Sequence, residues 1–290
     1  MSDVYAQNLS RDEAEAIRLD GQFDLLTENI GYLLHPEVLE SLSAKSSLKV
    51  ADLATGTARF LLRLVESNSF PENAILHGTD ISPALFPAPA AMPPNIDLGI
   101  FDIREPVPTH LEGSYDLVHV RQVAAGLHAS EWMPVMVNLT KLLKPGGALQ
   151  WEECNFANVI HLRGASSACT INGARKLGTM FRSGLWEHFQ HGWNRLEQGM
   201  VEAGLQNVGS EFVSSDRIPE TRGALTQNGI QVILRWANAK AQAGNLQDAN
   251  GKKVSVSEVQ ALGKQAIKDI DSGCYVRFDI HVGWGFKPNE

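Results

Sequence analysis

Short apolar runs alternate with stretches of helical periodicity between residues 48 and 154, and this alternation restricts the fold more than any other feature. Strand-like apolar runs are expected at 48–54, 74–80, 96–103, 115–121 and 148–154. Segments with helical spacing of apolar residues lie between them, at 57–67 and 129–143. Strands that alternate with helices form βαβ units with right-handed crossovers and therefore a parallel sheet. Such sheets bind ligands beyond the carboxyl ends of their strands, at the switch point.

A helical segment precedes the alternating region. Apolar residues recur at helical spacing over residues 12–27, and Ser10, followed by acidic residues, is suited to the start of a helix. A second, short helix is expected after Pro36. Residues 1–47 are therefore predicted to form a helical N-terminal cap on a domain of residues 48–290.

The alternation stops after residue 154. Two helices are expected within 164–204, so that a helical insert at about 156–204 follows the fifth strand. The elements expected after the insert are a strand at 207–216, helices at 229–241 and 255–271, and a late antiparallel strand at 274–286. The predicted fold class is α/β: a Rossmann-like, doubly wound, mostly parallel seven-stranded sheet with the helical cap and the helical insert.

The charge and cysteine content exclude several classes of function. The net charge is −8, and Lys and Arg form no basic stripe, which argues against a nucleic-acid partner. Three widely spaced cysteines, Cys154, Cys169 and Cys274, form no CxxC pair, so no structural metal site is predicted and reduced thiols are expected. No stretch approaches the roughly 20 apolar residues of a membrane span, and no targeting segment is recognisable. The location expected is the cytoplasm, with a small-molecule or protein partner.

The first motif that carries chemistry is the turn after the strand at 48–54. Asp52 ends this strand, and the small residues Ala54 and Gly56 follow before a helix begins. Small side chains let a ligand approach the backbone, and the helix start offers N–H groups. The G-x-G-x-x-G pattern of dinucleotide-binding proteins is absent. From these residues alone, a ligand with a cationic group near Asp52 and a turn without a ligand are nearly equal interpretations.

Two further strand ends also carry a carboxylate. Asp80 ends the strand at 74–80, where an acidic side chain can accept hydrogen bonds from both hydroxyls of a ribose. Asp102 follows Phe101, and together they offer an acceptor for an exocyclic amine and an apolar surface for a purine. Carboxylates at three successive strand ends fit one extended nucleoside.

Residues 48–153 resemble a class I S-adenosylmethionine-dependent methyltransferase. The stretches that carry the resemblance are VADLATGTARF, TDIS, FDI, YDLVHVRQ and LKPGGALQWEE. Together with RLDGQFDLLTENIGYLLHPEV, they are similar to the small-molecule methyltransferases of fungal secondary metabolism. Ala54 and Ala58 stand where these enzymes usually have glycine. Alanine can replace glycine there provided that neither residue adopts a positive φ.

The resemblance implies S-adenosyl-L-methionine as the cofactor and assigns residues to it. Asp52 would lie by the methionine moiety, and Ala54 and Gly56 would lie in the turn beneath the cofactor. Asp80 would bind the ribose. The adenine would contact three apolar side chains and one carboxylate, namely Ile81, Phe101, Ile103 and Asp102. Arg121 would frame the methionine end through backbone groups, and Gln22 either faces the same pocket or is a solvated helix residue.

Methyl transfer to oxygen or nitrogen also releases a proton, so a base can help. His128 lies just past the strand at 115–121 and is the first candidate, against the alternative of a surface or capping residue. Glu153 is the second candidate. Because side chains alternate along a strand, Glu152 and Glu153 face opposite sides of the sheet, and at most one points into a cleft. A purely structural role for both glutamates is the competing interpretation.

The insert carries several aromatic residues at helical spacing, and it is expected to cover the substrate. These residues are Phe181, Trp186, Phe189 and Trp193. Helical spacing also suits plain core packing, so we expect most of them to pack inward and one or two to line a pocket for an apolar acceptor.

The function predicted is transfer of a methyl group to an oxygen or nitrogen of a small apolar natural product. The partner expected is that small-molecule acceptor, and a homodimer is left open. Three alternatives are a regulatory relative acting through a protein partner, a catalyst that uses the cofactor without methyl transfer, and a nicotinamide oxidoreductase. The absent G-x-G-x-x-G pattern counts against the last.

Overall fold

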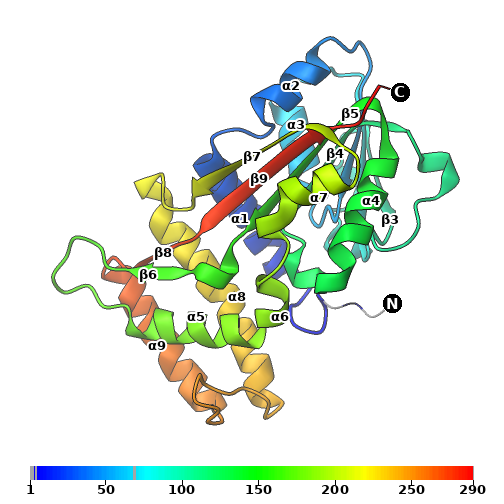
Figure 1. Ribbon diagram of the computed structural model, residues 1–290. Coiled ribbons are helices and arrows are strands. Elements are labelled where there is room, and N and C mark those ends of the chain that lie inside the picture. Colours follow the sequence, from blue (N-terminus) through cyan, green and yellow to red (C-terminus); the bar gives the residue numbers. More distant parts are fainter. Residues whose placement is uncertain (1–2, 4, 68–69, 290) are drawn as a thin grey trace.

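The computed structural model describes residues 3, 5–67 and 70–289 (Figure 1). Its centre is a seven-stranded sheet in the order β3-β2-β1-β4-β5-β9-β7. The strands are β1 (Lys49–Leu53), β2 (Ile75–Asp80), β3 (Ile96–Ile100), β4 (Tyr115–Arg121), β5 (Leu143–Cys154), β7 (Gln206–Ser214) and β9 (Asp279–Phe286). The predicted Rossmann-like, doubly wound, seven-stranded sheet is therefore confirmed.

The first five strands are parallel, and β9 runs antiparallel between β5 and β7. The chain builds the sheet outward from β1 through β2 to β3, and then returns to place β4 on the other side of β1. The order therefore reverses between β1 and β4. In sheets of this kind the crevice at the carboxyl ends of those two strands is the usual ligand site.

One face of the sheet is covered by α1 (Glu13–Ile30), α2 (Pro36–Ser43), α3 (Arg59–Glu66) and the start of α8 (Arg222–Gln242). Their apolar side chains pack on those of the strands, as Leu26 of α1 and Leu61 of α3 do around Val50 of β1. Asp12 caps the first turn of α1 by accepting a hydrogen bond from the Glu15 backbone N–H. The predicted helical cap thus packs directly on the sheet, and α1 extends three residues beyond the expected end.

The opposite face is covered by α4 (Trp132–Leu142) and α7 (Leu196–Glu202). Leu139 of α4 and Met200 of α7 pack in one core with Trp151 of β5. All three side chains are buried. Helices on both faces explain why the inner strands are apolar nearly throughout, as expected for buried parallel strands.

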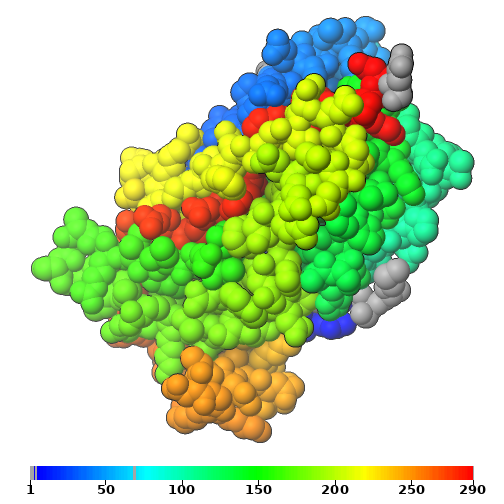
Figure 2. All heavy atoms as spheres, in the orientation of Figure 1, coloured from blue at the N-terminus to red at the C-terminus, as the bar shows by residue number. Residues whose placement is uncertain are grey.

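A separate group of helices lies beside the sheet, at the lower part of Figure 1. It contains α5 (Asn172–Gly184), α9 (Val256–Asp271) and the rest of α8, which share the core of Leu177, Trp236 and Val259. The short strands β6 (Ile160–Leu162) and β8 (Tyr275–Arg277) pair beside it. Figure 2 shows the turn between α8 and α9 as a projection at the bottom of the molecule.

Two predicted elements differ in detail. The insert holds three helices rather than two, because α6 (Trp186–Phe189) lies between α5 and α7. The expected strand at 274–286 is split into β8 and β9, which belong to different sheets. None of the helices among the described residues combines the length and apolarity that crossing a bilayer requires.

Candidate functional site

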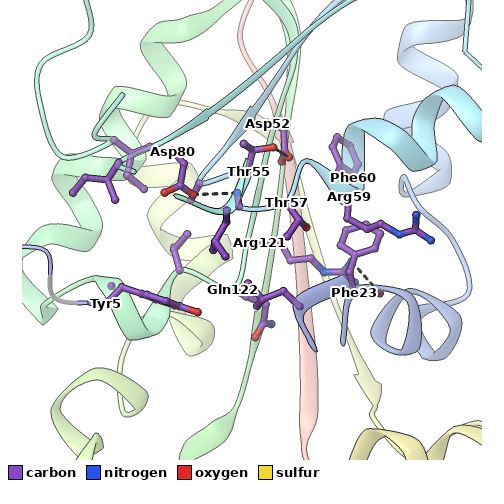
Figure 3. Close-up of a pocket in the computed structure, with 18 of the residues that line it drawn as sticks. Tyr5, Phe23, Asp52, Thr55, Thr57, Arg59, Phe60, Asp80, Arg121 and Gln122 are labelled. Carbon is purple, nitrogen blue, oxygen red and sulfur yellow. Dashed lines mark hydrogen bonds between the residues drawn. The ribbon is translucent and has the colours of Figure 1, made fainter. Parts of the chain in front are cut away.

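The main pocket lies at the switch point, beyond the carboxyl ends of β1, β2 and β4 (Figure 3). The turns after these strands form its floor. Helix α1 and the described part of the N-terminal segment form the remaining walls, and Figure 3 shows Phe23 and Tyr5 on opposite sides of it. Ten of the twelve side chains predicted to form the site line this pocket, and His128 and Glu153 do not.

The turn after β1 is wound into a left-handed conformation at three positions. The φ angles of Ala54, Gly56 and Ala58 are 56°, 53° and 58°. From the sequence, alanine is expected to replace glycine here only if neither Ala54 nor Ala58 adopts a positive φ. Both residues do adopt a positive φ. L-residues in this region carry a steric cost of about 1–2 kcal/mol, and such strain gathers at functional sites. A Cβ added at Gly56 would meet nothing within 4 Å, so the backbone there faces open space in the pocket.

Asp80 ends β2 with its carboxylate in the pocket (Figure 3). Oδ2 accepts a hydrogen bond from the Gly56 backbone N–H at 3.0 Å, and Oδ1 accepts one from the Ser82 N–H at 3.2 Å. Burial raises the pKa of Asp80, and these two hydrogen bonds act in the opposite direction. Ile81 follows in the pocket wall. The end of β2 therefore presents an oriented carboxylate beside an apolar side chain.

Phe101, Asp102 and Ile103 also line the pocket, at the end of β3. The carboxylate of Asp102 is engaged by the next arginine along the chain: Arg104 donates from Nη2 to Oδ2 at 2.7 Å and from Nε to Oδ1 at 2.9 Å. Burial would raise the pKa of Asp102, but these hydrogen bonds and the charge of Arg104 lower it. The sequence interpretation missed Arg104, which lines the same wall.

Asp52 is buried at the end of β1, and both of its carboxylate oxygens have partners. Oδ2 accepts a hydrogen bond from the Thr55 hydroxyl at 2.5 Å, and Oδ1 lies 2.7 Å from Nδ1 of His119. The prediction of a carboxylate in the pocket is met, but its neighbours His119 and Thr55 were not anticipated. His119 could have been found from register, because parallel pairing places Asp52 of β1 beside His119 of β4.

Arg121, at the end of β4, lines the pocket, and its side chain contacts Glu152 of β5 and Thr27 of α1. Its Nε lies 2.7 Å from Glu152 Oε2, and Nη1 donates to the Thr27 hydroxyl at 2.8 Å. The guanidinium lies 4.2 Å from the centroid of the Phe23 ring. The expectation that Arg121 frames the methionine end through backbone groups did not include this side-chain network, which connects the sheet to α1.

Helix α1 lines the pocket with Gln22, as one of the two interpretations of this residue predicted. Its apolar neighbours in the wall are Leu19, Phe23 and Leu26.

The sequence interpretation missed the contribution of the N-terminal segment, which adds Asp3, Tyr5 and Arg11 to the pocket wall. Arg11 forms an ion pair with Asp3 and lies 5.0 Å from the Tyr5 ring centroid. The Tyr5 hydroxyl donates to Glu15 at 3.2 Å. No apolar periodicity marks these residues, so their position depends on contacts that only the folded chain makes.

The structure places neither base candidate in the pocket lining. His128 is exposed, and its backbone N–H donates to Glu131 at the start of a short 3₁₀ turn, in the capping role that was the alternative. Glu153 is fully buried on the α4 face, where Oε1 accepts from Trp151 Nε1 at 3.0 Å and from the Val123 N–H at 2.8 Å. Burial raises its pKa to about 7.

The aromatic residues of the insert do not reach the pocket either. Phe189 is buried between Phe156 and Phe181, while Trp186 is 45 % exposed. The expectation that one or two of these aromatic side chains line the pocket is wrong. Helix α5, which carries Phe181, packs on α8 and α9, while α6, which carries Trp186 and Phe189, packs on the 3₁₀ turns at 124–126 and 156–158. The insert acts on the pocket only indirectly: His188 Nδ1 lies 3.0 Å from the backbone oxygen of Leu127, which is a lining residue.

Across the part of the chain that the structure describes, no three His, Cys, Asp or Glu side chains gather in a way that could hold a metal ion.

Comparisons with known proteins agree with this geometry. A family described as "Methyltransferase domain" matches residues 51–149. Methyltransferase grgD of Penicillium sp is 34 % identical over 93 % of this chain and 92 % of its own length. N-methyltransferase tcpN of Claviceps purpurea (strain 20.1) is 35 % identical over 90 % of this chain and 94 % of its own. A Haloferax volcanii methyltransferase, solved with the Trm112 activator, shares the fold with a TM-score of 0.52 at 14 % identity, covering 96 % of both chains.

Proposed function

The chain belongs to the S-adenosylmethionine-dependent methyltransferases, and on that premise we propose that it methylates a nitrogen atom of a small apolar natural product. The name of the relative tcpN, which is similar over nearly its whole length, supports nitrogen over oxygen as the acceptor atom. The observation that carries the proposal is the hydrogen bond from the Gly56 N–H, in the turn after β1, to Asp80 at the end of β2. The pocket is open next to Gly56, so a ligand can lie against this bonded pair.

The residues present fit the adenosyl and methionine parts of S-adenosylmethionine. A Cβ built on Gly56 would have no atom of the described residues within 4 Å, apart from its neighbours in the chain. This leaves room for a ligand against the turn. Nη2 of Arg121 is buried and has no hydrogen-bond partner among the described residues, although a guanidinium can donate from every nitrogen. A carboxylate in the pocket would satisfy it, and the methionine moiety carries one.

We assign the cofactor contacts accordingly. Asp80 would accept from the ribose hydroxyls, and Asp102 would accept from the adenine amine. Apolar contact with the adenine would come from Ile81, Phe101 and Ile103. The methionine end would lie near Asp52, Arg121 and Gln22, above the turn that contains Ala54 and Gly56.

When bound, S-adenosylmethionine supplies an electrophilic methyl group on a positively charged sulfur. The chain itself must align the acceptor nitrogen and exclude water, and alignment of this kind can lower the barrier by roughly 7–11 kcal/mol. Phe23 and Leu26 of α1 and Leu127 of the loop after β4 give the wall an apolar surface suited to these two tasks. That surface supports an apolar acceptor.

We propose that Glu153 acts through the loop after β4 rather than as a base. Its carboxyl is bonded to the Val123 N–H, and Val123 lines the pocket where Glu153 does not. His128 is exposed and does not line the pocket, so we propose no proton transfer through it. A neutral amine can attack without prior loss of a proton, and the released proton can pass to water.

Three finer points are also proposals: the absence of a nucleic-acid partner, the compartment and the oligomeric state. The net charge of −8 supports a site that takes no nucleic acid. All three cysteines are unpaired and buried, which supports a reducing compartment such as the cytoplasm. A homodimer is compatible with the fold, and sedimentation analysis would establish the oligomeric state.

The experiment that tests the function is a calorimetric titration with S-adenosylhomocysteine and NAD side by side, followed by turnover assays with paired amine and alcohol acceptors. We expect S-adenosylhomocysteine to bind and NAD not to bind, and we expect the amines to be methylated. Binding of NAD alone would overturn the methyltransferase assignment. Methylation of the alcohols but not of the amines would overturn the choice of nitrogen.

A further inference from the structure

Three neighbouring strands place a row of charged side chains under the pocket floor. Asp52 of β1, His119 of β4 and Glu152 of β5 all project from the sheet face that carries α1, α2 and α3. None of the three is more than 3 % exposed. His119 lies in the middle: Nδ1 is 2.7 Å from Asp52 Oδ1, and Nε2 is 3.8 Å from Glu152 Oε1. Two buried carboxylates therefore flank one imidazole.

The surroundings of Nε2 distinguish the two charge states of His119. This atom is buried and forms no hydrogen bond among the described residues, and the group that faces it is the Glu152 carboxylate. A neutral imidazole that donates from Nδ1 to Asp52 would turn a lone pair toward that carboxylate, so that two acceptors would oppose each other. A doubly protonated imidazole would present an N–H there instead.

Among the described residues, the carboxylates within 4 Å of the His119 ring nitrogens are those of Asp52 and Glu152. The Phe60 ring of α3 stacks on the imidazole with centroids 3.6 Å apart and planes 7° apart, which excludes water from that side. Arg121, two residues along β4, pairs with the far oxygen of Glu152 at 2.7 Å. Gln150, the register partner of His119 on β5, donates to Glu152 Oε1 at 2.7 Å. The charges facing His119 are thus Asp52, Glu152 and, beyond the latter, Arg121.

We propose that His119 is a positioning residue that stays doubly protonated and holds Asp52 and Glu152 together under the cofactor's amino-acid end. One N–H fixes the carboxylate of Asp52 in the pocket wall. The other N–H neutralises Glu152, which in turn orients Arg121 and, through Thr27, helix α1. The inference rests on the proposed placement of the cofactor and adds a residue that does not itself need to touch it.

The balance of charges supports this arrangement. Two carboxylates and two cations make the cluster neutral, whereas a neutral imidazole would leave one buried negative charge without compensation. Burial alone would lower the pKa of His119, but the hydrogen bond to Asp52 and the charges of Asp52 and Glu152 raise it. Burial likewise would raise the pKa of Glu152, but the charges of Arg121 and His119 lower it.

The first test observes the protons directly and needs no cofactor. In ¹⁵N-labelled protein at neutral pH, we expect both ring nitrogens of His119 to show the shifts of an imidazolium. In E152Q, which removes one of the two flanking charges, His119 should lose its second proton at a lower pH than in the unmodified protein. A singly protonated ring at neutral pH, or an unchanged titration in E152Q, would overturn the proposal.

The second test measures the consequence for the site. H119N is neutral, and we expect it to bind S-adenosylhomocysteine at least about tenfold more weakly, since breaking a buried charge pair is costly. The affinity of the unmodified protein should also fall as pH rises through the His119 pKa, while that of H119N should be flat. H77N is the matched control, because His77 of β2 lies outside the pocket lining and its ring Nδ1 lies 3.0 Å from the Tyr115 hydroxyl.

The outcomes separate this inference from the proposed function. Equal affinity and equal pH profiles in H119N and H77N would remove the positioning role and leave the methyltransferase site intact. Failure of the unmodified protein to bind S-adenosylhomocysteine would instead refute the proposed function, whatever the spectra show. Should H119N not fold, the E152Q titration still decides the charge state.

Discussion

Oδ2 of Asp80 accepts a hydrogen bond from the backbone N–H of Gly56 at 3.0 Å, which joins the end of β2 to the turn after β1. Asp80 and Gly56 lie 24 residues apart in the chain, and both line the pocket. The bond orients the carboxylate toward the ligand and holds the left-handed turn in place. The Asp80 side chain therefore fixes the conformation of the turn and also places a hydrogen-bond acceptor in the pocket.

Replacement of Asp80 by alanine should weaken binding of S-adenosylhomocysteine by about tenfold to hundredfold, because hydrogen bonds to a charged group contribute about 1.5–3 kcal/mol. Calorimetry measures the effect. D97N is the control, since Asp97 of β3 is exposed and does not line the pocket. Unchanged affinity in D80A would exclude Asp80 as the ribose ligand.

Replacement of Ala54 by glycine should stabilise the protein by about 1 kcal/mol, because glycine adopts the φ of 56° without steric cost. The melting temperature should rise by roughly 2–4 °C. A261G, in the exposed middle of α9, should have the opposite sign, since glycine weakens a helix by about 1 kcal/mol. A loss of stability in A54G would show that the Ala54 methyl group contributes more than its backbone strain costs.

Replacement of Glu153 by glutamine should change how stability depends on pH. Burial raises the pKa of Glu153 from 4.5 to about 7, so between these values the folded state binds more protons than the unfolded state. The free energy of unfolding of the unmodified protein should therefore fall, relative to E153Q, as pH rises from 4.5 to 7, by at most about 3 kcal/mol. Above pH 7 the difference should stay constant.

Urea unfolding at a series of pH values measures this difference. E112Q is the control, because Glu112 is exposed and its removal should leave the curve unaltered. If the stability curves of E153Q and the unmodified protein run parallel, the pKa of Glu153 is the same in the folded and unfolded states, and the prediction is wrong.

Replacement of Tyr5 by alanine should weaken S-adenosylhomocysteine binding about threefold to tenfold, because the ring forms part of the pocket wall and aromatic contacts contribute about 0.5–1.5 kcal/mol. Y5F keeps the ring and loses only the hydrogen bond to Glu15, so it should bind almost as tightly as the unmodified protein. Equal affinities of Y5A and Y5F would show that the N-terminal segment does not contribute to this site.

The sheet could be predicted from local patterns because each inner strand is short, apolar and bounded by polar turns. Asp80 and Gly56 were recognisable for the same reason: each stands where a strand ends, and strand ends in a parallel sheet share one edge. The late strand was also marked by its composition. That it divides between two sheets depends on pairing partners more than 60 residues away, such as Cys154, which pairs with Ile280.

The side-chain networks were beyond such reasoning. The pair of Asp52 and His119 requires the register of β1 against β4, and the bond between Arg121 and Thr27 requires the docking of α1. His128 was chosen for its place in the chain, but it is exposed and lies outside the lining, although its neighbour Leu127 lines the pocket. The direction of a loop side chain depends on tertiary contacts that no periodicity records.

Strand β9 lies between β5 and β7, although it is formed by residues 279–286. During synthesis, every other strand of the central sheet leaves the ribosome before this one does. Until then β5 and β7 have no partner on their facing edges, and unpaired strand edges attract other chains. The central sheet therefore closes only after residue 286 has been synthesised, and until then the facing edges of β5 and β7 are open to non-native pairing.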